Sequence, residues 1–115
     1  MERVTGITSD FRQSFQFLTP NGEKVDFSLY YYMTQQSWFF DFTYKNYTCN
    51  CQKVVLTPNA LRHLKNIIPF GIAFYSNDKV EPIFVDDFES GRIQMLILDE
   101  DEVKEVELNI YGISE

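Results

Sequence analysis

The fold is decided by the stretch Ser37-Trp38-Phe39-Phe40-Asp41-Phe42-Thr43-Tyr44, which concentrates aromatic side chains in a short segment. With a period of two, the large rings at positions 38, 40, 42 and 44 share one face, and mostly polar residues share the other. This alternation is typical of a β-strand with one buried face. Because each large ring can bury about 150–250 Å², we expect this strand to organise the core.

Two segments before this strand predict a hairpin. Residues 13–18 alternate apolar and polar side chains, and residues 19–22 contain the proline, asparagine and glycine of a tight turn. Residues 24–33 alternate again, with the odd-numbered side chains inward and the even-numbered ones outward. Residues 1–10 lack this pattern and are expected to form an N-terminal arm with a short strand at residues 4–7.

The second half of the chain predicts further strands and one helix. Along residues 48–56 the buried face changes partway, so the sequence leaves the register of this strand open. Residues 57–65 are the predicted helix, because Thr57 suits the N-cap position and Pro58 suits the first helical position. A strand is expected at residues 72–75, and an extended piece is expected at residues 82–85.

The C-terminal third adds two more expected strands. Residues 92–98 are almost continuously apolar, which is typical of a strand buried on both faces. Residues 99–102 are acidic and predict a turn. Apolar residues then alternate with charged ones over residues 105–111, which predicts a final strand with one charged face.

These patterns predict a mainly β fold. We expect one domain spanning residues 1–115, built as a small barrel or sandwich of about six to seven strands with one short helix. Residues 1–10 are its arm, and residues 100–115 are an acidic C-terminal extension. The residues expected in the structural core are Phe27, Leu29, Trp38, Phe40, Phe42 and Leu96.

Composition and charge restrict the class of protein. The start of the chain has no apolar signal segment, and no apolar run approaches the roughly 20 residues of a membrane helix, so we expect a soluble protein that is not exported. The net charge is −7, and residues 80–115 hold eleven acidic side chains against Arg92 and Lys104. This polarity argues against nucleic acid as a partner.

The sequence contains no recognisable catalytic or metal-binding motif. His63 is the only histidine and has no nucleophile motif beside it, so we expect it at the surface or its boundary. Cys49 and Cys51 provide two soft ligands where a structural zinc site needs four, and they are expected to be reduced thiols. The acidic runs lack the spacing of an EF-hand and are expected to be solvated turns. We therefore expect no enzyme activity, no cofactor and no metal.

Three aromatic residues, Tyr30, Tyr32 and Phe39, are expected on the outward faces of adjacent strands. Such rings can stack single-stranded bases, but the neighbouring outward residues are acidic or neutral, and not basic. Exposed aromatic patches commonly mark protein contacts, so a covered protein interface or secondary packing is the preferred interpretation. The acidic residues added to this candidate interface are Asp86, Asp87, Glu105 and Glu107.

Several short motifs point to a family by their order and spacing. They are Gln13-Ser14-Phe15, the turn at Asn21-Gly22, the alternating residues 25–31, Trp38-Phe39-Phe40-Asp41, the segment around Leu61, Ile68-Pro69-Phe70-Gly71, and Asp86-Asp87-Phe88 followed by Gly91-Arg92 and Met95-Leu96-Ile97. In this order, residues 11–99 resemble the small baseplate plug family of contractile-tailed bacteriophages.

The resemblance implies a non-enzymatic virion protein in the tail baseplate, present in the bacterial host cytoplasm during assembly. Its implied partners are hub and spike proteins near the tail axis, with tube or wedge proteins and copies of itself in a symmetric assembly as further contacts; no membrane is implied. An alternative from another class is a small-ligand or carbohydrate-binding β-barrel, and a third hypothesis is a hydrolase with an acid pair. A saturable ligand site would favour the ligand-binding barrel, and loss of activity on replacing one carboxylate would favour the hydrolase.

Overall fold

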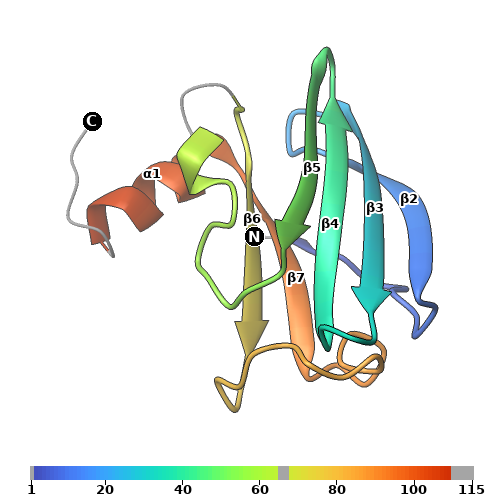
Figure 1. The fold of residues 1–115 in the computed structure, drawn as a ribbon. Coiled ribbons are helices and arrows are strands. Elements are labelled where there is room, and N and C mark those ends of the chain that lie inside the picture. The colour runs from blue at the N-terminus through green and yellow to red at the C-terminus, as the bar shows by residue number, and fades with distance from the viewer. Residues whose placement is uncertain (1, 65–67, 110–115) are drawn as a thin grey trace.

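The computed structural model describes residues 2–64 and 68–109 of the chain. They form seven strands in two antiparallel sheets and one α-helix (Figure 1). The four-stranded sheet has the order β2-β3-β4-β5, with β2 (Arg12–Leu18), β3 (Lys24–Tyr32), β4 (Ser37–Tyr44) and β5 (Tyr47–Lys53). The three-stranded sheet has the order β1-β7-β6, with β1 (Glu2–Arg3), β7 (Ile93–Leu98) and β6 (Gly71–Ser76). The helix is α1 (Glu100–Asn109), and a 3₁₀ turn, η1, spans Arg62–Leu64.

The mainly β prediction is confirmed, and of the two expected forms, barrel or sandwich, the closed barrel does not form in the part of the chain that the structure describes. The two sheets face each other across one core, and within the described residues they are not joined edge to edge. The reason lies in β1, which is only two residues long and pairs with β7 instead of β2. The short strand expected at residues 4–7 is therefore replaced by this shorter one at Glu2–Arg3.

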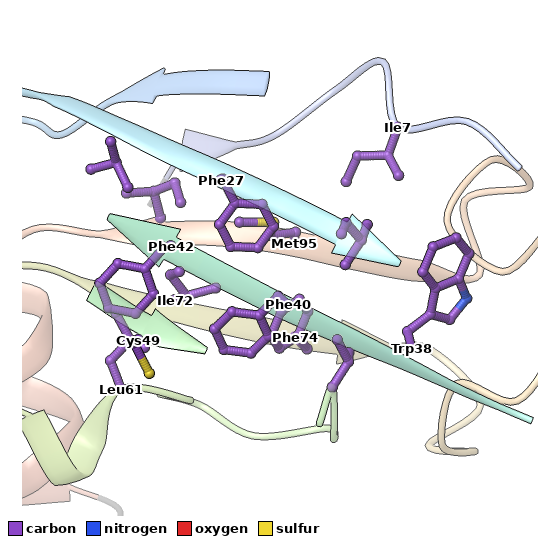
Figure 2. Close-up of a cluster of buried hydrophobic side chains, with 14 of the residues drawn as sticks. Ile7, Phe27, Trp38, Phe40, Phe42, Cys49, Leu61, Ile72, Phe74 and Met95 are labelled. Carbon is purple, nitrogen blue, oxygen red and sulfur yellow. The ribbon is translucent and has the colours of Figure 1, made fainter. Parts of the chain in front are cut away.

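The strand β4 lies inside the four-stranded sheet, paired with β3 and β5. Phe27 of β3 lies directly opposite Phe42 and stacks on Phe40, with ring centroids 5.4 Å apart. Figure 2 shows these three rings pointing toward Ile72 and Met95 of the other sheet. Burial of rings on facing sheets supplies most of the apolar area that stabilises a fold of this kind. The fully buried large side chains of this region also include Leu29, Trp38, Ile93 and Ile97.

The strand β7 is fully buried on its core face, whereas its other face, which was also expected to be buried, is only partly buried at Gln94 and Leu96. Ile93, Met95 and Ile97 face the core between the sheets. Leu96, expected in that core, lies on the opposite face and is only partly buried, where it packs against the apolar cluster of Ala73, Leu98, Val103 and Val106. The expectation for Leu96 needs correction because alternate residues of a strand face opposite sides of the sheet.

The C-terminal segment forms a helix instead of the predicted acidic turn and strand. Asp99 Oδ1 accepts a hydrogen bond from the Glu102 backbone N–H (2.8 Å), and Glu102 Oε1 accepts one from the Asp99 N–H (3.1 Å). This reciprocal pair is a capping box, and the acidic residues of the first turn also interact favourably with the helix dipole. Val103 and Val106, three residues apart, then pack on the outer face of the three-stranded sheet. Residue 110 and those after it lie outside the described residues.

The helix predicted over residues 57–65 does not form within its described part, residues 57–64, beyond the 3₁₀ turn η1. Thr57 instead exchanges two backbone hydrogen bonds with Phe74 of β6 (3.2 and 3.1 Å), and the Ala60 N–H donates to the Ile72 carbonyl (2.6 Å). Tertiary hydrogen bonds along the edge of β6 therefore override the local capping signal. The segment expected to be extended at residues 82–85 is part of a loop with turns.

Pairing between β4 and β5 shifts at a β-bulge. Phe40 lies opposite Gln52 and Phe42 opposite Cys49, so two residues of β5 oppose the single residue between the phenylalanines. Cys51 adopts a positive φ of 58° at this point. The change of buried face that the sequence predicts along this strand is thereby confirmed.

Candidate protein interface

The outer aromatic patch, which we define as Tyr30, Tyr32 and Phe39, forms on the face of the four-stranded sheet that points away from the core. Tyr30 of β3 lies directly opposite Phe39 of β4, with ring centroids 6.1 Å apart. Tyr32 contacts both rings, at 5.4 Å from Tyr30 and 5.3 Å from Phe39. Sequence alternation thus brings together the three aromatic residues predicted for an interface.

The three rings of the patch differ in exposure. Tyr32 is 44% exposed and Phe39 is half-buried, whereas Tyr30 is only 3% exposed. The guanidinium carbon of Arg12 lies 4.8 Å from the Tyr30 ring centroid, which is close enough for a cation–π contact. Arg12 faces Tyr30 across the β2–β3 pairing. Tyr32 and Phe39 therefore provide the accessible aromatic surface. The buried Tyr30 ring packs against both of them.

The Tyr30 hydroxyl is held by the bulge in β5. It donates to Asp41 Oδ1 (2.8 Å) and contacts Cys51 Sγ (3.5 Å), while the Cys51 backbone N–H donates to the same carboxylate oxygen (2.7 Å). Burial raises the pKa of Tyr30, and its hydrogen bonds to Cys51 and Asp41 raise the pKa further. These contacts fix the patch in one arrangement.

Asp87 was expected at the interface, but it is 2% exposed and lies inside a hydrogen-bond network. Its Oδ2 accepts the backbone N–H groups of Ile83 (2.8 Å) and Phe84 (2.9 Å), as well as Arg92 Nη2 (2.7 Å). A buried carboxylate with these partners organises its own loop and is not presented to a partner protein. Its neighbour Asp86 is exposed and stays in the candidate interface.

Glu107 was also expected at the interface, and it too is 2% exposed. Arg62 Nε donates to Glu107 Oε1 at 2.9 Å, which ties α1 to the turn η1. Glu105 is exposed on the same helix. The sequence did not indicate that Arg12, Arg62 and Arg92 bind Tyr30, Glu107 and Asp87. The only signal available was for Arg92, which is one of two basic residues in the acidic C-terminal third.

The residues weighed for chemistry are His63 and the two cysteines of β5. His63 is exposed in η1. Cys49 is buried and Cys51 is exposed, both are free thiols, and burial raises the pKa of Cys49. Within residues 2–64 and 68–109, groups of three or more His, Cys, Asp and Glu side chains arranged to hold a metal ion are absent. In the same residues, the helices are too short and too polar to cross a membrane.

The chain matches the family described as "Cyanophage baseplate Pam3 plug gp18" over residues 2–101. It belongs to this baseplate plug family. The resemblance inferred from the sequence motifs is thereby confirmed, and it extends to β1, ahead of the first motif. No curated protein matches the chain.

Membership of the plug family gives the chain a structural role in a phage baseplate and a location in the virion tail. The matched residues include both sheets and Asp99 of the capping box, whereas Glu102 and most of α1 lie beyond them. The outer aromatic patch lies wholly within the matched part. Most of the acidic residues of α1 therefore lie outside the region that matches the family.

Proposed function

We propose that the chain is a non-enzymatic plug of a contractile-tail baseplate that acts as a single domain and packs against hub and spike proteins near the tail axis. The observation that carries this proposal is the family match over residues 2–101. A plug contributes shape and interface area instead of turnover. The tightly packed aromatic core between the sheets supports such a mechanical role (Figure 2).

The outer aromatic patch is the surface we assign to a baseplate neighbour. Tyr32 and Phe39 offer large rings that are already held by ring contacts and by the hydrogen bonds of Tyr30. Rings that are already held in place lose little conformational entropy on binding. More of the free energy gained by burying them therefore contributes to affinity. The exposed acidic residues Asp86 and Glu105 are proposed as contacts for basic side chains at the rim.

The first test is quantitative mass spectrometry of gradient-purified phage particles. We expect this chain at a low, constant ratio to the hub and spike proteins. Absence from intact particles, with abundant free chain in the lysate, would overturn the plug proposal. In that case the small-ligand or carbohydrate alternative is tested by titrating the purified chain with ligand libraries for one saturable site. The core rings fill the space between the sheets, so such a ligand would bind at the surface.

The second test assigns the surface. A double variant, Tyr32→Ser with Phe39→Ser, should reduce incorporation of the chain into particles, because it removes the accessible rings of the patch. Tyr75→Ser is the matched control, since Tyr75 is 50% exposed on β6, in the other sheet. Equal incorporation of the double variant and the control would show that the patch is not an interface.

A further inference from the structure

The two sheets end in four edge strands, and three of these edges are blunted. The strand β1 is two residues long. The edge of β6 is covered by backbone hydrogen bonds from Thr57 and Ala60, and the edge strand β5 is distorted by the bulge at Cys51. Short, covered or bulged edges prevent unwanted strand pairing. Three of the four edges therefore have a recognisable form of protection.

The fourth edge, β2, has none of these protections. It pairs with β3 without a break over all seven residues, Arg12–Leu18. It contains no proline and no lysine, and Arg12 is its only charged residue. A long, regular and nearly uncharged edge is a template for an added strand.

The hydrogen-bond pattern shows which groups this edge presents. The Tyr31 N–H donates to the Phe11 carbonyl (2.7 Å), one step before Arg12 pairs with Tyr30. In an antiparallel pair hydrogen-bonded positions alternate, so the odd-numbered residues of β2 bond to β3. The backbone groups of Ser14 and Gln16 consequently point away from β3, and across residues 2–64 and 68–109 no other segment bonds to them.

A hollow lies beside this edge, where the two sheets fail to close. It has a volume of about 510 Å³ and is lined by both apolar and charged residues. The apolar ones include Val4, Phe17, Leu18 and Ile97, and the charged ones are Glu2 and Arg3. Leu18 is 55% exposed, and Phe15 and Phe17 are only partly buried. Alternate side chains of a strand added to β2 would cover these rings and enter the hollow.

We propose that the free edge of β2 binds an extended segment of a different baseplate protein as a fifth strand, with alternating apolar residues that fill the hollow. The proposal rests on the proposed plug function, which supplies the neighbouring proteins. A second copy of this chain fits poorly, because two β2 edges would pair about a two-fold axis and its other three edges are short, covered or bulged. A cyclic assembly around a tail has only the tail axis as its symmetry element.

The distribution of charge supports an uncharged segment as the occupant. The acidic helix α1 lies on the far side of the three-stranded sheet, away from β2 (Figure 1). The charge nearest the edge within the strand itself is Arg12. Close to the edge, Glu2 and Arg3 line the hollow, and Asp26 Oδ1 accepts a hydrogen bond from Gln16 Nε2 (2.6 Å). Charges of both signs are therefore present at the proposed contact, and neither favours a charged occupant.

The test measures hydrogen–deuterium exchange of the β2 peptide in the isolated chain and in purified particles. Outward amides of an edge strand exchange quickly until another strand binds them. We expect exchange at Ser14 and Gln16 to slow by about tenfold or more in the particle. Unchanged exchange in particles that contain the chain would overturn this inference alone, whereas absence of the chain from particles would overturn the plug function as well.

A photo-crosslinker in place of Gln16 identifies the occupant in the same particles. We expect a crosslink to one extended segment of another baseplate protein, with alternating apolar residues. A crosslink to a second copy of this chain, or to residues scattered over several proteins, would overturn the proposed partner. A synthetic peptide of the identified segment is then titrated into the purified chain.

Variants at the edge separate strand addition from loss of fold. Gln16→Pro removes an outward N–H while leaving the ladder to β3 intact, so the variant should fold and yet bind the peptide at least about tenfold more weakly. Gln16→Lys should weaken binding by adding an edge charge. Thr48→Lys on β5 is the matched control, because it adds the same charge at another exposed strand position. Equal binding by Gln16→Pro and Thr48→Lys would overturn the proposal.

Discussion

Asp87 and Arg92 form a two-point ion pair at the boundary of the core. Arg92 Nη2 lies 2.7 Å from Asp87 Oδ2, and Arg92 Nε lies 2.9 Å from Asp87 Oδ1. The hydrogen bond and the charge of Asp87 raise the pKa of Arg92. The Trp38 indole N–H donates to the Phe84 carbonyl (3.1 Å) in the loop that Asp87 organises. The pair thus connects an irregular loop to the central strand.

We expect Arg92→Met to lower the free energy of unfolding by about 2–4 kcal/mol, because it leaves a buried carboxylate without its cation. This loss should be smaller than for a fully buried ion pair, since the Arg92 side chain is 21% exposed. Urea denaturation measures the change. Asp78→Asn is the control, because Asp78 contacts the same guanidinium but is half exposed, so its loss should have a small effect. Equal midpoints for the two variants would contradict this role for Asp87.

Trp38→Ala should lower the free energy of unfolding by about 3–5 kcal/mol, through lost burial and a cavity in the core. The indole is fully buried and packs edge-on against Phe88, with ring centroids 5.4 Å apart. Phe84→Ala provides the comparison, because that ring is 57% exposed and its removal opens little space. A denaturation midpoint for Trp38→Ala near that of the unsubstituted chain would show that β4 is not the centre of the fold.

The strands β2, β3 and β4 were predictable because their pattern is local. An alternation of apolar and polar residues decides both the strand and its inward face, whatever lies elsewhere in the chain. The same alternation placed Tyr30, Tyr32 and Phe39 together on the outer face. The alternation does not show where a strand ends. Met33 was expected to point inward, but it lies beyond the end of β3 and is exposed.

The parts that sequence analysis missed depend on partners distant in the chain. Arg62 and Glu107 are 45 residues apart in sequence, so no spacing rule shows that they pair. Thr57 carries a genuine helix signal that loses to hydrogen bonds with Phe74. The error at α1 was different, since the Asp99-x-x-Glu102 capping box was visible in the sequence but was interpreted as a turn.

The capping box makes a direct prediction about α1. Asp99→Ala should lower stability by about 1 kcal/mol, because the Glu102 N–H loses its acceptor at the helix start. Asp101→Ala is the matched control: this residue is acidic and exposed in the same turn but is not part of the capping box. Thermal unfolding of both variants measures the difference. Equal melting temperatures would mean that the capping hydrogen bonds do not stabilise the fold.

Stability should fall in alkaline solution, because burial raises the pKa values of Tyr30, Tyr31 and Tyr44. An unfolded tyrosine releases its proton near pH 10, whereas these folded ones retain it to higher pH. Below about pH 10 both states are protonated and the contribution is complete. Above that pH the unfolded state binds fewer protons, so the free energy of unfolding decreases and the contribution is lost as the pH rises through the folded pKa values.

Urea midpoints measured between about pH 8 and pH 11 test this dependence. Tyr30→Phe should make the alkaline decrease shallower, since it removes one raised pKa while keeping the ring that contacts Phe39. Tyr32→Phe is the control in the same patch, because its side chain is 44% exposed, whereas the Tyr30 hydroxyl is buried and hydrogen-bonded to Asp41. The same slope in both variants would show that the Tyr30 hydroxyl, although bonded to Asp41, does not link folding to pH.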